Sequence, residues 1–204
     1  MKDQATLPSL PFPTPSTGTA SRIPRLLASV LCAACLGIGS LAASAADAAR
    51  PALHPELEAL RPFLGRTWSG EFKNSTPEKP VVDISRWERA LNGQAVRILH
   101  SINRGSYGGE TIVRWDAEKK ALVYFYFTTA GFMTTGTMTI SGQRYVAHEK
   151  VSGAADGTTE VRSSGELKPD GTMVTESEYL KGGQWVPGHG AVYREAPGAE
   201  VVFK

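Results

Sequence analysis

Cysteine is nearly absent from this sequence. Of 204 residues only two are cysteines, Cys32 and Cys35, and both lie near the N-terminus. The chain after residue 35 therefore cannot contain a disulfide framework, a thiolate metal site or a cysteine nucleophile. The C-x-x-C spacing of the pair also occurs in redox motifs, but its apolar surroundings favour a cleaved targeting segment.

An excess of charge of one sign is also lacking. The formal net charge is +2, from 22 basic and 20 acidic residues. Residues 1–46 contain Lys2, Arg22 and Arg25 but only Asp3, so the rest of the chain is neutral. A balanced chain without a basic run gives no electrostatic reason to expect a nucleic acid or an anionic membrane as partner.

Recognised catalytic motifs are missing as well. The sequence has no G-x-S-x-G elbow, no H-E-x-x-H and no phosphate loop. Its four histidines, His54, His100, His148 and His189, do not stand at metal-binding spacings. These absences favour a protein that is not an enzyme, and they predict no metal and no cofactor from motifs alone.

The N-terminal segment is typical of exported proteins. Residues 1–21 are rich in Pro, Ser and Thr and predict a disordered extension. Arg22 and Arg25 then precede an uncharged run from residue 26 to residue 46 that ends in small residues, which predicts a secretory signal peptide. The mature domain is then periplasmic or secreted, with no membrane contact after cleavage. A permanent anchor and lipidation at Cys35 are the alternatives.

The stretch from Leu122 to Ile140 predicts a β-hairpin. Aromatic and β-branched residues fill both arms, and the turn falls at residues 129–131. Neither face of the first arm is charged, so we expect both faces to be covered and the inner face to line a core or a cavity.

The remainder of the chain has the same period of two. After a linker and one short helix in residues 47–66, short strands separated by Gly-containing turns fill a domain of residues 67–196. Consecutive antiparallel strands can remove their edges by closing on themselves. The sequence therefore predicts an all-β protein with a single up-and-down barrel of about ten strands, and we expect a monomer. A β-sandwich of the same strands is the alternative architecture. The strands are predicted to begin near Thr67, Val81, Gln94, Glu110, Ala121, Phe132, Arg144, Thr158, Thr172 and Trp185.

The segment Leu60–Phe72 resembles the start of lipocalin-like calycin domains. Gly65-x-x-Trp68 is similar to their opening G-x-W, although it is one residue longer. The resemblance is closer to bacterial lipocalin-like families of unknown function and more distant to the haem-binding nitrobindins. It implies a ten-stranded barrel with a cavity for a small apolar molecule, in families that include carriers, haem proteins and a few enzymes.

The ligand-binding candidates follow from this expectation. The central hairpin supplies an apolar wall with a few hydroxyls, and an inward Arg97 could pair with a ligand carboxylate. Arg97 and His100 are three residues apart on one strand, so at most one of them faces inward. The full set of candidates is Trp68, Arg97, Tyr124, Tyr126, Thr134 and Met138.

Two alternatives accompany the ligand-binding hypothesis. In nitrobindins a late-strand histidine holds the haem iron, and Pro187–Arg194 is similar in outline, so the resemblance makes His189 an alternative haem ligand. The glycines on both sides of His189 favour a turn over a wall position. The other alternative is a structural or envelope-interaction module whose interior is filled with side chains.

Overall fold

The computed structural model describes residues 52–204. The predicted extension, signal peptide, anchor and lipidation site lie outside the described residues. Within residues 52–204, none of the helices has the length and apolar character needed to cross a bilayer.

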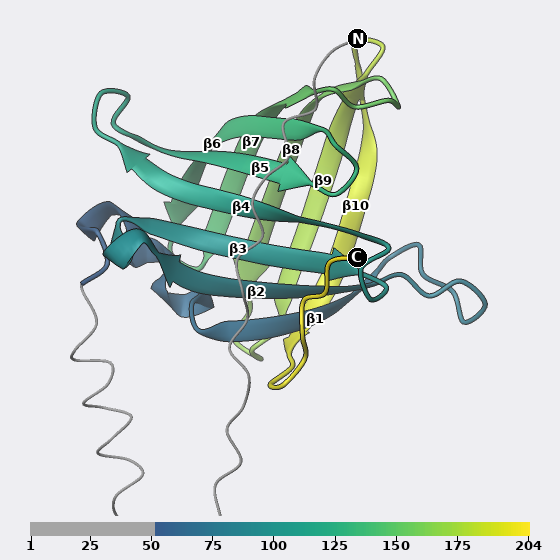
Figure 1. The fold of residues 1–204 in the computed structure, drawn as a ribbon, viewed down its shortest axis with the longest axis horizontal. Coiled ribbons are helices and arrows are strands. Elements are labelled where there is room, and N and C mark those ends of the chain that lie inside the picture. The colour runs from purple at the N-terminus through teal and green to yellow at the C-terminus, as the bar shows by residue number, and fades with distance from the viewer. Residues whose placement is uncertain (1–51) are drawn as a thin grey trace, which may run out of the picture. The chain divides into compact units, whose positions relative to one another are not determined.

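Ten antiparallel strands form a closed barrel in which each strand pairs with its neighbours in sequence, and β1 pairs with β10 (Figure 1). The predicted all-β up-and-down barrel is therefore confirmed. The largest difference in strand starts is at β4, which begins at Tyr107 instead of Glu110. The strands are β1 Arg66–Phe72, β2 Val82–Ala90, β3 Ala95–Ile102, β4 Tyr107–Asp116, β5 Ala121–Thr128, β6 Met133–Ser141, β7 Arg144–Ser152, β8 Thr158–Leu167, β9 Met173–Lys181 and β10 Gln184–Glu195.

A short helix closes one end of the barrel. This 3₁₀ helix, η1, spans Pro55–Phe63, with His54 as its N-cap and Pro55 in its first turn. Its apolar residues Leu57, Leu60 and Phe63 are fully buried, and the Phe63 ring stacks on Trp87 with centroids 5.1 Å apart. A second 3₁₀ turn, η2 (Leu91–Gly93), joins β2 to β3.

The central hairpin differs from the prediction on its outer face. Phe125 and Phe127 are 41% and 50% exposed, whereas Val123 on the same face is buried. The expectation that both faces are covered was wrong, because a barrel wall needs a cover on its inner side only. A missing charge on the outer face therefore did not indicate burial.

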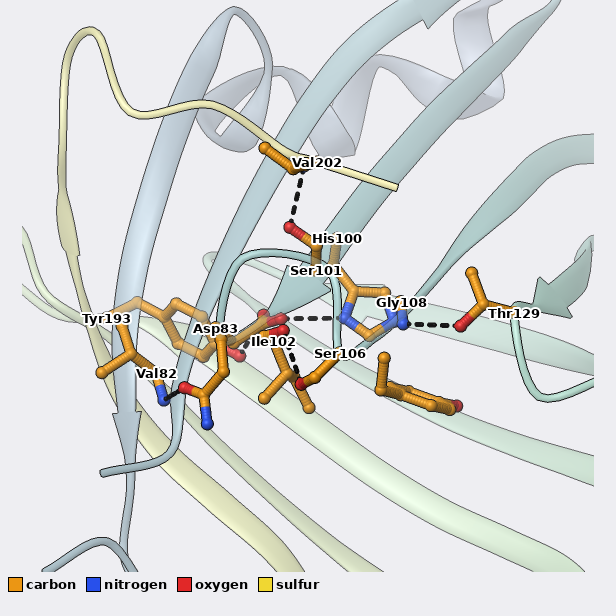
Figure 2. Close-up of polar contacts among 12 residues, drawn as sticks. Val82, Asp83, His100, Ser101, Ile102, Ser106, Gly108, Thr129, Tyr193 and Val202 are labelled. Atoms are coloured by element: carbon orange, nitrogen blue, oxygen red, sulfur yellow. Dashed lines mark hydrogen bonds and ion pairs between the residues drawn. The ribbon is translucent and has the colours of Figure 1, made fainter. Parts of the chain in front are cut away.

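The C-terminal segment lies against the outside of β3. The Val202 amide donates to Ser101 Oγ at 3.0 Å, and Ser101 is 1% exposed (Figure 2). Because Ser101 and His100 are neighbours on β3, their side chains point to opposite sides of the wall. The segment after β10 thus buries the outer surface directly behind an inward-facing histidine.

The closed end is expected to carry much of the barrel's stability. Leu60→Ala removes a side chain that is 0% exposed and should lower the free energy of unfolding by about 2–5 kcal/mol. The control Leu91→Ala removes a side chain that is 69% exposed and should change it by less than about 0.5 kcal/mol. Urea denaturation measures both, and an equal effect of the two variants would contradict the assignment of η1 as a packed plug.

Candidate functional site

The barrel interior contains a hollow in two connected parts. A deep cavity of about 250 Å³ lies between the closed end and the middle of the barrel, and a mouth cavity of about 610 Å³ leads outward. Five residues line both parts: Phe72, His100, Tyr126, Glu149 and Ser163. We call their position the junction. The interior is therefore not filled with side chains, contrary to the filled-core alternative.

A buried carboxylate on β2 organises the polar side chains of this hollow. Asp83 is 3% exposed and accepts hydrogen bonds from His100 Nδ1 at 2.9 Å and from the Tyr193 hydroxyl at 2.9 Å (Figure 2). His100 Nε2 lies 2.7 Å from the Tyr126 hydroxyl, which lies 2.8 Å from the Tyr107 hydroxyl. The result is a continuous chain from the barrel wall to the mouth.

The chemistry of the partners fixes one end of this chain. A carboxylate only accepts, so Nδ1 of His100 donates to Asp83. In the bond between Tyr107 and Tyr126 either hydroxyl can be the donor. Burial raises the pKa values of Tyr107 and Tyr126, so both hydroxyls keep their protons. The hydroxyl oxygens of Tyr107 and Tyr126 also have lone pairs, so the mouth end of the chain can accept hydrogen bonds.

A second carboxylate faces the junction from β7. Glu149 accepts hydrogen bonds from the hydroxyls of Thr134 and Tyr124. Burial nevertheless raises the pKa of Glu149, because these bonds only partly replace the lost water. Within residues 52–204, Glu149 forms no ion pair, and neither part of the hollow is lined by lysine or arginine.

Glycines in the intervening strands allow these contacts. Gly70 on β1 pairs with Tyr193 on one side and Asp83 on the other, and a Cβ there would lie 2.4 Å from the Tyr193 ring. The ring therefore crosses β1 over bare backbone to reach Asp83. Tyr126 crosses β4 in the same way over Gly109, where a Cβ would lie 2.3 Å from its ring, and so reaches His100.

The Tyr124 contact repeats this arrangement on β6. Gly136 pairs with Tyr124 on one side and with Glu149 on the other. A Cβ at Gly136 would lie 2.3 Å from the His148 carbonyl oxygen and 2.8 Å from Glu149 Cβ. In all three places a tyrosine reaches a partner two strands away across a position of the middle strand that is occupied by glycine.

His189 lies at the rim of the mouth, on β10. Its ring contacts Phe72, with centroids 5.0 Å apart, and Tyr179, with centroids 5.5 Å apart. Partial burial lowers the pKa of His189, which favours the neutral imidazole. The expectation of a turn was wrong: the flanking glycines belong to the strand, at an irregularity between Pro187 and Gly190.

Most of the predicted ligand-binding residues line the hollow. Tyr124 and Met138 line the deep cavity, Thr134 lines the mouth cavity, and Tyr126 lines both. Trp68 is 0% exposed and packs into the core at the closed end, outside the lining of either part. Trp68 therefore fills the core and does not line the hollow.

Arg97 is a correction to the sequence-based placement. Its guanidinium binds Glu110 through two hydrogen bonds of 3.0 Å and contacts Glu88 at 3.2 Å, on the outer surface of the barrel. The alternation of β3 turns His100 inward and Arg97 outward. Arg97 therefore does not face an occupant of the hollow.

Sequence reasoning missed the two inward carboxylates. Asp83 shares a face with Ser85 and Trp87 at a period of two, and that alternation was the available signal. Glu149 sits between His148 and Lys150 in a strand where charged residues are frequent, so it gave no local signal. Their importance depends on strand register, which brings Asp83 beside His100 and Glu149 two strands from Tyr124.

The comparisons with known proteins support the fold. No protein-family model matches the sequence, and no curated protein does. Among solved structures, the crystal structure of Rv2717c from M. tuberculosis is similar, with a TM-score of 0.53 and 16% identity over 71% of this chain and 99% of that chain. At this identity the likeness concerns the barrel architecture alone.

Glu149 should make the stability depend on pH. Its folded-state pKa is raised above the ordinary 4.5, so between these two values the folded state keeps a proton that the unfolded state has lost. The free energy of unfolding should therefore fall as pH rises through that window. Glu149→Gln has no such group, so its free energy of unfolding relative to that of wild type should increase as pH rises through that window.

The matched control is Glu166→Gln, on the outer face of β8. Lys168 lowers the pKa of Glu166, so its contribution has the opposite sign and is lost as pH falls. Denaturant unfolding at several pH values measures both variants. A pH-independent difference between wild type and Glu149→Gln would show that Glu149 is not buried as described.

Proposed function

We propose that this protein binds a small hydrophobic molecule non-covalently inside the barrel. The observation that carries the proposal is the two-part hollow, which has the size and the mixed lining of ligand pockets. Aromatic and aliphatic side chains form most of its walls, and a few polar groups converge at the junction. A closed end and an open mouth give an occupant one buried position and one route of access.

Three further expectations belong to this proposal. The resemblance of Leu60–Phe72 to lipocalin-like domains agrees with a carrier barrel, and the N-terminal sequence agrees with export to the periplasm or beyond. A closed barrel has no free sheet edge with which to pair, which agrees with a monomer. The proposed role needs no catalysis.

Dye binding tests the proposal. The uncharged dye N-phenyl-1-naphthylamine fluoresces in apolar surroundings and should bind the wild-type protein. Ser163→Trp places an indole at the junction, where it competes with any occupant, and should weaken dye binding about tenfold or more. Fluorescence titration measures the dissociation constants.

The adjacent Ser164→Trp is the control, because Ser164 points to the other side of β8. It adds the same side chain to the same strand and should bind the dye as wild type does. Equal loss in both variants, or no saturable dye binding by the wild-type protein, would contradict ligand binding in this hollow.

Haem is a second candidate occupant, favoured by the position of His189. Its imidazole lies at the mouth between two aromatic rings and is favoured in the neutral form, which is the form that binds iron. His189 would hold the iron of a bound haem, and Phe72 and Tyr179 supply aromatic surface beside that imidazole. Bound haem would supply an iron centre at the entrance of the hollow.

Haem titration followed by absorbance tests this candidate. Wild type should develop a saturable Soret band, and His189→Ala should lose it or shift it markedly. His148→Ala is the control, because His148 faces outward and binds Glu160. A Soret band unchanged in His189→Ala would rule out this ligand, and no band in wild type would rule out haem.

A further inference from the structure

Among residues 52–204, the lining of the hollow contains carboxylates but no lysine or arginine. Three carboxylates line the two parts of the hollow: Asp83, Glu149 and Asp156. Asp156 is exposed and binds Lys181 at 2.6 Å, which lowers its pKa to about 2. Asp83 is enclosed by His100 and Tyr193. Only Glu149 faces the open space without a cationic or imidazole partner in the described part of the chain.

The neighbouring hydrogen bonds leave acceptors at the same place. Tyr107 and Tyr126 line the hollow, and their hydroxyl oxygens have lone pairs that can accept a hydrogen bond there. The hydroxyls of Thr134 and Tyr124 are used on Glu149. The Ser163 hydroxyl can donate or accept and does not discriminate between ligands.

Two nitrogen donors near the hollow do not offset this bias. The indole nitrogen of Trp87 has no hydrogen-bond partner among residues 52–204, but it is itself buried and offers no open surface. His189 is favoured in its neutral form, so it brings no fixed positive charge to the mouth.

The walls around the junction are also suited to a cation. Phe72 and Tyr126 line both parts of the hollow, and Tyr107 and Phe132 stack in the mouth with centroids 6.5 Å apart. Aromatic faces attract an ammonium group electrostatically, and the attraction is stronger where water is excluded. A carboxylate and several aromatic rings around one space form a recurrent arrangement for binding organic cations.

We infer that the occupant is a hydrophobic amine, with its ammonium group at the junction beside Glu149 and the Tyr126 oxygen and its apolar body in the deep cavity. This inference rests on the proposed ligand-binding function and names the chemical class of the ligand. An acidic ligand is disfavoured at the same position, because its carboxylate would meet Glu149 and acceptor oxygens with no lysine or arginine in the described lining to pair with.

A matched series of three alkyl compounds tests the inference. Octylamine, octanol and octanoate share one chain and differ in the head group, which is cationic, neutral or anionic near neutral pH. Isothermal titration calorimetry with the wild-type protein should give an affinity for octylamine about tenfold or more above that for octanol, because a hydrogen-bonded ion pair replaces a neutral contact. Octanoate should bind most weakly.

Two variants locate the effect. Glu149→Gln keeps the size of the side chain and removes its charge, so octylamine affinity should fall about tenfold while octanol affinity stays within about twofold. Glu56→Gln removes a carboxylate from the exposed surface of η1 and should leave all three affinities unchanged.

The outcomes separate the two levels of the proposal. If octanol or octanoate binds wild type as tightly as octylamine, or if Glu149→Gln weakens all three equally, the amine inference is wrong while ligand binding stands. If neither the alkyl series nor the uncharged dye binds, both the inference and the proposed function are overturned. Because the wild-type series alone decides selectivity, the test does not depend on the stability of a variant.

Discussion

The structure of the barrel interior depends on hydrogen bonds that join its two inward carboxylates to tyrosine hydroxyls on other strands. A polar side chain that leaves water must regain its hydrogen bonds inside the protein. Tyr193, Tyr126 and Tyr124 do so by crossing a neighbouring strand at a glycine. The glycines thus determine which tyrosine meets which acceptor, and the ring of paired strands from β1 to β10 keeps them in register.

The two inward carboxylates illustrate different solutions to burial. Asp83 is almost completely enclosed and accepts hydrogen bonds from His100 and Tyr193 at the end of a hydrogen-bond chain. Glu149 receives two hydroxyl donors but no opposite charge in the described structure, and its raised pKa reflects that deficit. Asp83 therefore links side chains of three strands by hydrogen bonds, whereas Glu149 faces the open space of the hollow.

The architecture could be predicted from the sequence, because alternation and turn residues repeat along most of the chain. Tyr124, Tyr126, Thr134 and Met138 line the hollow, and the same alternation is what made them candidates for an inner wall. Alternation alone did not decide between Arg97 and His100, since either could face inward. Asp83 and Glu149 were missed because their partners lie on other strands, and pairing across strands depends on a register that no single strand encodes. The outward His148 and inward Glu149 differ by only one position.

The plug formed by η1 also limits the routes by which a molecule could enter or leave the barrel. With Leu57, Leu60 and Phe63 sealing one end, entry and departure share a single passage. For the ligand that we propose, side chains deep in the barrel would contribute to affinity, while the rim around Phe132, Tyr179 and His189 would control the rate of exchange. A change at the rim alone could then alter residence time while affinity stays the same.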